Sequence, residues 1–194
     1  MLRVGLTGGL ATGKSFVGEI LVELGCHLFK ADDAGRAVIA PGGEAAEAVA
    51  REFGTTDRAE LAARVFADAG ALARLNAIVH PAVRARQAAW MAALPWDAIA
   101  VVEAAILIET GSAKSFDTIV LTVCDPDIQF ARAMSRPGAR EDDVRARLAR
   151  QMPQDQKRAH ADYIIDTSGT FEDTRAQTLR VFASLDSQRG RHEG

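Results

Sequence analysis

The chain has 194 residues, of which 48% are hydrophobic, and a formal net charge of −3. This size and apolar content fit one α/β domain with an appended subregion, and the slightly acidic balance speaks against a nucleic-acid partner. No apolar run is long enough to cross a bilayer and no signal-peptide pattern opens the sequence, so we expect a cytoplasmic protein with no membrane partner.

The first motif along the chain is a glycine-rich stretch, residues 8–15, that fits G-x-x-x-x-G-K-[ST]. An apolar run, Leu2–Leu6, precedes it and an amphipathic stretch, Phe16–Leu24, follows it, which is the strand–loop–helix order that a phosphate-binding loop needs. Backbone N–H groups of such a loop and the positive end of the helix bind phosphate oxygens. We therefore predict an ATP site formed by Gly8, Gly9, Ala11, Thr12, Gly13, Lys14, Ser15 and Phe16.

Two of these residues have side-chain roles in the prediction. Lys14 is expected to reach the β- and γ-phosphates, and the Ser15 hydroxyl to hold Mg²⁺. Glu103 ends a later predicted strand, where an acidic side chain helps to orient the same ion, so we assign it to the metal site as well. ATP and Mg²⁺ are thus the expected cofactors.

Short apolar runs separated by helical patterns continue along the chain and predict a parallel sheet with helices on both faces. The expected strands are Leu2–Leu6, Cys26–Phe29, Ala98–Glu103, Thr118–Cys124 and Tyr163–Asp166. The fold class is therefore α/β, specifically a P-loop NTPase fold with a five-stranded parallel sheet.

Two stretches interrupt this alternation of strands and helices. Residues 43–94 carry an alanine-rich helical pattern, which we interpret as a substrate-binding insert at the carboxyl edge of the sheet; a helical bundle without a ligand role is the alternative. Residues 130–157 are rich in arginine and are interpreted as a lid. We expect one domain, with core segments 1–42, 95–129 and 158–186 and a polar tail at 187–194.

The spacing of the arginines in the predicted lid would put several of them on one helical face. Such a face delivers guanidinium groups to a transferring phosphate, although a solvated charged face is the usual explanation of such a run. The residues are Arg132, Arg136, Arg140, Arg145, Arg147 and Arg150.

Acidic residues follow two of the predicted strands. Asp32 and Asp33 come just after the second strand, where a carboxylate can accept the proton of an attacking hydroxyl; the alternative role is a helix N-cap. Glu109 lies six residues beyond Glu103, and there a functional role and a plain surface position are equally supported.

No Asn-Lys-x-Asp guanine signature follows a predicted strand, and the layout suits a small-molecule kinase whose lid excludes water. Another small P-loop kinase, acting on a nucleoside monophosphate or a small alcohol, and a non-catalytic nucleotide-binding module remain alternatives.

Several short motifs, in order along nearly the whole chain, resemble the dephospho-CoA kinase family. They are Val4–Gly9 with Gly13-Lys14-Ser15, Asp32…Arg36 with Pro41-Gly42, His80-Pro81, Ile106–Glu109, Gln129-x-x-Arg132-x-x-x-Arg136, Arg147-x-x-x-Gln151, and Ala161–Asp166 with Gly169.

The resemblance implies transfer of the ATP γ-phosphate to the ribose 3′-hydroxyl of dephospho-CoA, which is then the expected small-molecule partner. It implies that Asp32 is the general base and that Arg36, His80 and Glu109 bind the acceptor with it. Charge around the transferring group would be neutralised by Lys14, Arg136, Arg140 and Arg147, and the loop at Gly169 would hold adenine.

The sequence departs from the family pattern at four positions. Lys30 replaces the first acid of an Asp-x-Asp, Ala105 stands where proline is usual, Ala11 replaces a glycine, and Phe16 stands where threonine is common. Lys30 puts a cation near the proposed base Asp32, which would weaken it as a base, and Ala105 would loosen the loop that leads to Glu109. The two changes in the phosphate-binding loop alter its tuning more than its function, because backbone N–H groups bind the phosphate. The oligomeric state is left open.

Overall fold

The computed structural model describes residues 1–68 and 70–191 and divides the chain into two compact units. The first unit comprises residues 1–29 and 94–194, and the second comprises residues 30–93. Residues 192–194 of the predicted tail lie outside the described residues, and residues 187–191 continue the last helix rather than forming a tail.

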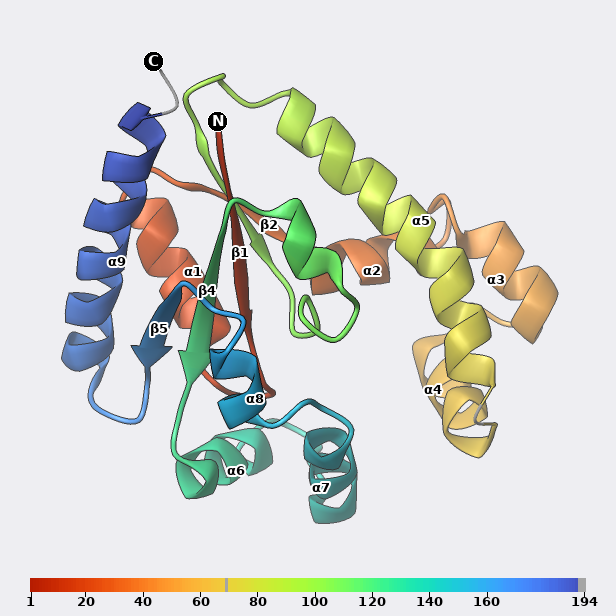
Figure 1. The fold of residues 1–194 in the computed structure, drawn as a ribbon. Helices are drawn as coiled ribbons and strands as arrows, with labels where there is room; N and C mark the ends of the chain where they lie inside the picture. The colour runs from red at the N-terminus through yellow and green to blue at the C-terminus, as the bar shows by residue number, and fades with distance from the viewer. Residues whose placement is uncertain (69, 192–194) are drawn as a thin grey trace. The chain divides into compact units, whose positions relative to one another are not determined.

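A five-stranded parallel sheet of order β2-β3-β1-β4-β5 forms the centre of the fold and confirms the predicted fold class (Figure 1). Each predicted strand agrees with an observed one to within two residues at either end. The strands are β1 (Leu2–Gly8), β2 (His27–Lys30), β3 (Ile99–Glu103), β4 (Thr118–Val123) and β5 (Tyr163–Asp166).

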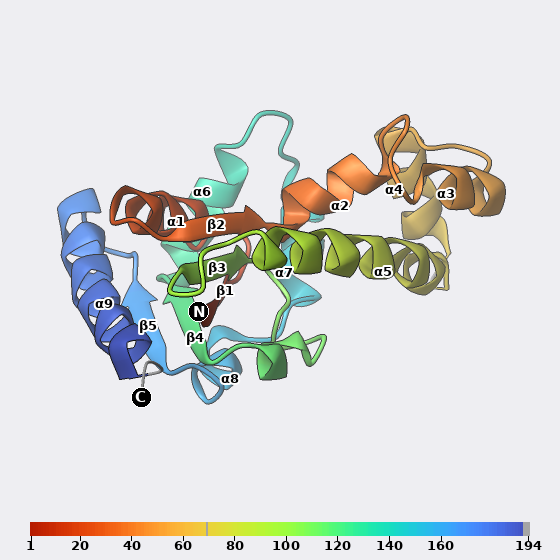
Figure 2. The same cartoon turned by 90° about the horizontal axis from the view of Figure 1, so that it is seen from above.

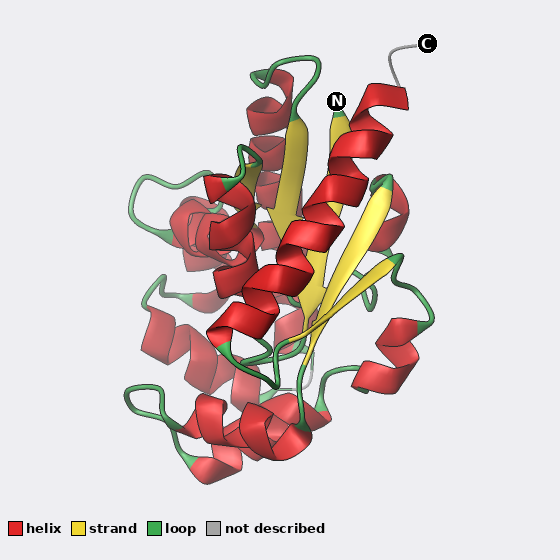
Figure 3. Cartoon of the chain, turned by 90° about the vertical axis from the view of Figure 1, so that its left-hand side faces the viewer, coloured by secondary structure: helices red, strands yellow, loops and turns green. Residues whose placement is uncertain are grey.

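One face of the sheet is covered by α1 (Lys14–Glu23) and α9 (Phe171–Arg191), which lie side by side in Figures 1 and 3. Val4 and Leu6 of β1 point to this face and are buried in a cluster with Val17 of α1 and Leu185 of α9. The alternation of side chains along a strand then sends Gly5 to the opposite face.

On that opposite face the chain after β3 approaches the sheet closely. A methyl group at Gly5 would lie 3.0 Å from Leu107 and 3.1 Å from Phe116, so glycine allows the segment between β3 and β4 to pack on the strand. This segment contains the short 3-10 helix η1 (Ser112–Ser115), and α8 (Gln154–Arg158) contacts β4.

The second unit is a helical cluster in which α5 packs on the other three helices (Figure 2). Its helices are α2 (Ala31–Ile39), α3 (Ala46–Phe53), α4 (Arg58–Ala67) and α5 (Ala71–Ala92). Val38, Val49, Phe53 and Val79 are buried together at its centre. Because Val38 belongs to this core, the unit includes α2 and begins at Lys30, earlier than the residue 43 expected for the insert.

The predicted lid, residues 130–157, does not present its arginines on one helical face. The chain forms α6 (Pro126–Met134) and α7 (Glu141–Ala149), and the turn between them contains Pro137 and Gly138 in a left-handed conformation, φ +73°. The expectation of one face was wrong because this Pro-Gly pair ends the first helix and redirects the chain. Within residues 1–68 and 70–191, no helix is both long and apolar enough to cross a membrane.

Candidate active-site residues

The glycine-rich stretch forms a loop between β1 and α1, as predicted, and two residues in it have left-handed backbone. Gly13 caps the start of α1 with φ +76°, and Ala11 has φ +58°. Ala11 is the non-glycine residue with positive φ among those described, and it stands where the related family pattern has glycine. Its methyl group is buried against Ala133 of α6 and Val144 of α7.

Side chains from four other segments hold this loop in place. The Thr12 and Thr122 hydroxyls share a hydrogen bond of 2.8 Å, and Thr167 donates from its hydroxyl to the Thr12 carbonyl at 3.2 Å. Gln129 donates to the Leu10 carbonyl, and Gln151 accepts from the Leu10 N–H, each at 2.8 Å. Since Thr122 and Thr167 lie at or beyond the carboxyl ends of β4 and β5, the loop is tied to one edge of the sheet.

Lys14 is in the first turn of α1, and its ammonium group turns back over the loop. It donates to the Gly8 carbonyl at 2.9 Å and to the Gly9 carbonyl at 2.8 Å. The cation is therefore held at the loop that we predict to bind phosphate, at the positive end of the helix dipole.

Ser15 and Glu103, the two predicted metal ligands, are in contact. The Ser15 hydroxyl donates to Glu103 Oε1 at 2.8 Å, whereas Glu103 Oε2 is buried and has no hydrogen-bond partner in the part of the chain that the structure describes. Hydroxyl and carboxylate oxygens are ligands that Mg²⁺ accepts, so this pair fits the ion. Among the described residues no group of three or more His, Cys, Asp and Glu side chains gathers to hold a metal by itself. A phosphate-bound ion would therefore take most of its ligands from the nucleotide and water.

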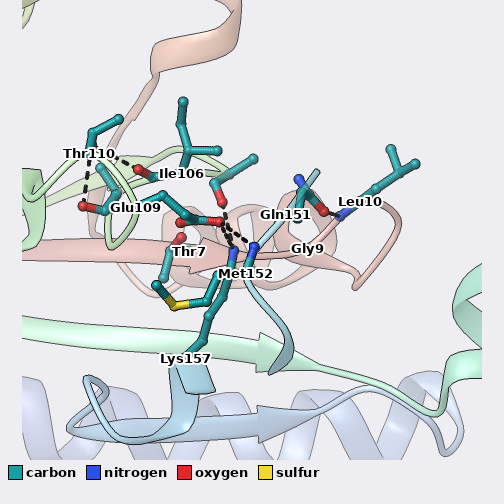
Figure 4. A network of polar contacts seen from close by, with 12 residues as sticks. Thr7, Gly9, Leu10, Ile106, Glu109, Thr110, Gln151, Met152 and Lys157 are labelled. Carbon is teal, nitrogen blue, oxygen red and sulfur yellow. Dashed lines mark hydrogen bonds and ion pairs between the residues drawn. The ribbon is translucent and has the colours of Figure 1, made fainter. Parts of the chain in front are cut away.

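Glu109 lies in the segment after β3 and forms an ion pair with Lys157 of α8 (Figure 4). Lys157 Nζ is 2.7 Å from Glu109 Oε1 and donates to the Ala105 carbonyl at 3.1 Å. The Lys157 side chain is 1% exposed and that of Glu109 20% exposed. Glu109 is thus not a plain surface residue, and its carboxylate is oriented by the protein.

The predicted acceptor residues Asp32, Arg36 and His80 all belong to the second unit. Asp32 and Asp33 are exposed in the first turn of α2, where carboxylates interact favourably with the helix dipole, and Arg36 pairs with Asp33. Neither aspartate is the N-cap that we considered as an alternative, because α2 begins at Ala31 and the cap position is occupied by Lys30.

His80 lies in the middle of α5, directly before the proline of that helix. Partial burial lowers the pKa of the His80 imidazole, and the positive charge of Arg84 one turn away lowers it further. The neutral imidazole is therefore favoured near pH 7, in which form one ring nitrogen donates and the other accepts a hydrogen bond. A neutral, two-way hydrogen-bonding group suits a residue proposed to contact the hydroxyls or the base of a nucleoside.

The predicted lid arginines fall into two groups. Arg136, Arg140 and Arg147 are exposed and have no ion-pair or hydrogen-bond partner for their guanidinium groups among the described residues. Arg132 and Arg145 are engaged within the protein: Arg132 donates to the carbonyl and hydroxyl of Thr167, and Arg145 pairs with Glu141 and stacks over Phe130. The guanidinium groups predicted to act on phosphate are thus the ones without a partner among the described residues, whereas Arg145 and Arg150 are exposed as well.

Gly169, predicted near adenine, lies in the turn between β5 and α9. A methyl group there would be 2.8 Å from Asp173 Oδ2, which accepts from the backbone and side chain of Thr170 to cap α9. Beside this turn, Phe16 of α1 and Phe171 of α9 form an edge-to-face pair with ring centroids 5.0 Å apart. The predicted adenine loop therefore adjoins the residue that follows the phosphate-binding motif.

Sequence reasoning missed roles for Lys157, Gln154 and Thr122, and quoted Gln129, Arg132 and Gln151 only as parts of motifs. Gln154 bonds to both backbone groups of Cys124, at 2.9 Å each, which fixes α8 against the end of β4. Nothing in the polar run around residue 157 marks a buried lysine. The one usable signal was the spacing of Gln129 and Arg132 on α6 and of Arg136 just beyond its end.

Comparison with known proteins places the chain in context. A family model described as dephospho-CoA kinase matches residues 2–173. A dephospho-CoA kinase of Geobacillus kaustophilus is 39% identical over 96% of this chain and 98% of its own length. That of Mesorhizobium japonicum is also 39% identical, over 98% of this chain and all of its own length.

Solved structures agree in fold. The protein TT1252 from Thermus thermophilus superposes with a TM-score of 0.82 at 28% identity, over 95% of this chain and 97% of that one. A shikimate kinase from Acinetobacter baumannii reaches a TM-score of 0.54 at 18% identity, covering 97% of this chain and 94% of that one, which is a likeness of fold alone.

Proposed function

The chain belongs to the dephospho-CoA kinase family, and from this premise we propose that it transfers the γ-phosphate of ATP to the ribose 3′-hydroxyl of dephospho-CoA. The product is coenzyme A. The observation that carries the proposal is the family match over residues 2–173, together with near-complete coverage of relatives of the same activity. The phosphate-binding loop held between β1, β4 and β5 supports the use of ATP.

In the proposed reaction the loop residues 8–16 bind the triphosphate through backbone N–H groups and Lys14 neutralises charge on it. Arg136, Arg140 and Arg147 add positive charge as the phosphoryl group is transferred, and their exposed guanidinium groups are consistent with this role. The turn at Gly169 holds the adenine of ATP.

We assign Mg²⁺ to Ser15 and Glu103, because their contact and the unpartnered Glu103 oxygen suit a cation site. When bound with ATP, the ion would neutralise negative charge on the triphosphate.

On the acceptor side, Asp32 accepts the proton of the attacking 3′-hydroxyl, while Arg36, His80 and Glu109 bind the dephospho-CoA. A carboxylate base contributes on the order of 10²–10⁴ to the rate of such a transfer. Asp32 suits this role because it is an exposed carboxylate that directly follows the carboxyl end of β2, the end at which ligands bind in open α/β sheets.

The test is an acceptor-competition assay with MgATP and purified protein, in which dephospho-CoA, AMP, adenosine and shikimate are offered together. Phosphorylation of dephospho-CoA alone is the expected outcome. Preferred phosphorylation of another acceptor would contradict the proposed substrate and favour another small P-loop kinase. Nucleotide binding without transfer to any acceptor would contradict the proposed activity and favour a nucleotide-binding module.

A cytoplasmic location and the lack of a nucleic-acid partner stay predictions from composition.

A further inference from the structure

The segment that follows α7, residues 151–157, contacts the phosphate-binding loop, the end of β4 and the segment after β3. Figure 4 shows its contacts through Gln151, Met152 and Lys157. Its start holds the phosphate-binding loop, since Gln151 accepts from the Leu10 N–H. Its middle holds the end of β4 through Gln154. Its end, Lys157, reaches the segment after β3. The last of these contacts is the least expected, because lysine is almost never fully buried unless it is paired.

Lys157 forms its ion pair with one of the two carboxylate oxygens of Glu109. Glu109 Oε1 is 2.7 Å from Lys157 Nζ and also accepts from the Met152 N–H at 3.3 Å, so two donors of the same segment converge on it. Glu109 Oε2 is buried and has no hydrogen-bond partner among the described residues. The carboxylate is therefore held by one oxygen and leaves the other to accept a further hydrogen bond.

Stability alone gives a weak reason for this arrangement. Burying an ion pair has a desolvation cost that its Coulomb attraction often fails to offset, and apolar side chains of similar volume are frequently as stable. An unpartnered buried carboxylate oxygen adds a further cost. A buried lysine fixes the orientation of the Glu109 carboxylate, whereas an apolar residue in its place would not.

We infer that Lys157 is a positioning residue, which with the Met152 N–H orients Glu109 so that Oε2 accepts a hydrogen bond from the nucleoside part of the acceptor. The partner group is a neutral donor, a hydroxyl or an exocyclic amine. The inference rests on the proposed function, in which Glu109 binds dephospho-CoA, and extends it to a residue that does not itself touch substrate.

The experiment is a double-mutant cycle on Lys157→Met and Glu109→Gln, with KM and kcat measured separately for ATP and dephospho-CoA. Each single variant is expected to raise the KM for dephospho-CoA about tenfold, the scale of one hydrogen bond to a charged group. The KM for ATP should stay near that of the unsubstituted protein. In the Glu109→Gln background, Lys157→Met should have little further effect, because its action passes through the carboxylate.

Gln151→Ala is the matched control. It changes a residue of the same segment, but the contact that it removes is to the phosphate-binding loop and not to Glu109. It is expected to raise the KM for ATP and to leave that for dephospho-CoA unchanged. A purely structural role of Lys157 would change the KM of both substrates alike, or thermal stability only, and would overturn the inference. So would full additivity of the two substitutions in the cycle.

Lys157→Met by itself leaves the Glu109 carboxylate without its cation, and the variant can fail to fold. The double variant has no such carboxylate, and its kinetic constants are then compared with those of Glu109→Gln alone. Agreement supports the inference, and a further rise in the KM for dephospho-CoA contradicts it. Failure of the unsubstituted protein to phosphorylate dephospho-CoA is a separate result, which would remove the proposed function and this inference together.

Discussion

The phosphate-binding loop and the first turn of α2 are held in different ways, although both carry residues proposed for the same reaction. In the loop, Leu10 and Thr12 are bonded to side chains from β4, α6, the segment after α7 and the turn after β5. In α2, Asp32 is exposed and Arg36 is paired with its neighbour Asp33. The fold thus preorganises the phosphate-binding loop, whereas the first turn of α2 presents exposed charges that a substrate would have to order.

The largest effect is expected from a substitution in the exposed first turn of α2. Replacing Asp32 with Asn removes the proposed proton acceptor, so kcat should fall on the order of 10²- to 10⁴-fold. The KM for ATP should change little, because the loop proposed to bind ATP makes its contacts within the other unit. Steady-state kinetics with both substrates measure this.

Asp33→Asn is the matched control, since Asp33 is the adjacent exposed carboxylate on the same turn. It is expected to lower kcat far less than Asp32→Asn. Equal losses in the two variants would show that the local negative charge matters rather than a base at residue 32.

A smaller effect is expected from adding a methyl group to the phosphate-binding loop. In Gly8→Ala the new Cβ would lie 2.2 Å from Thr122 Oγ1 and 2.6 Å from the Thr122 carbonyl oxygen, distances that force the strand or the loop to shift. We expect the free energy of unfolding to fall by about 1–3 kcal/mol and ATP binding to weaken. Denaturant titration and calorimetric ATP binding give the two values, and unchanged values for both would show that the loop is less tightly packed than described.

A glycine-to-alanine substitution in α2 should have the opposite effect on the free energy of unfolding. Gly35 lies inside α2, and a Cβ there meets no heavy atom within 4 Å. Gly35→Ala should therefore raise the free energy of unfolding by about 0.5–1 kcal/mol, because glycine weakens a helix interior. A rise in thermal midpoint without a change in the KM for ATP is the expected result; a fall would point to crowding around α2.

The fold was predictable because its signals are local. Runs such as Leu2–Leu6 and Thr118–Cys124 are mostly apolar, as is typical of strands covered on both faces, and each matches an observed strand. The Pro-Gly pair at residues 137–138 is also a local signal, and because it separates α6 from α7, the expected single helical face was wrong. The assignment of α2 to the helical unit depends on Val38 packing with Val49 and Val79, a contact that no local pattern encodes.

The candidate site also has features that local sequence determines and features that only tertiary contacts determine. A loop of fixed glycines, one lysine and one serine specifies phosphate binding by itself, because backbone conformation and helix dipole act over a few consecutive residues. What holds the loop is decided by tertiary structure: Gln129, Gln151 and Thr167 lie more than a hundred residues away in sequence. The pairing of Lys157 with Glu109 is of this second kind, since burial of a charge depends on every segment packed around it.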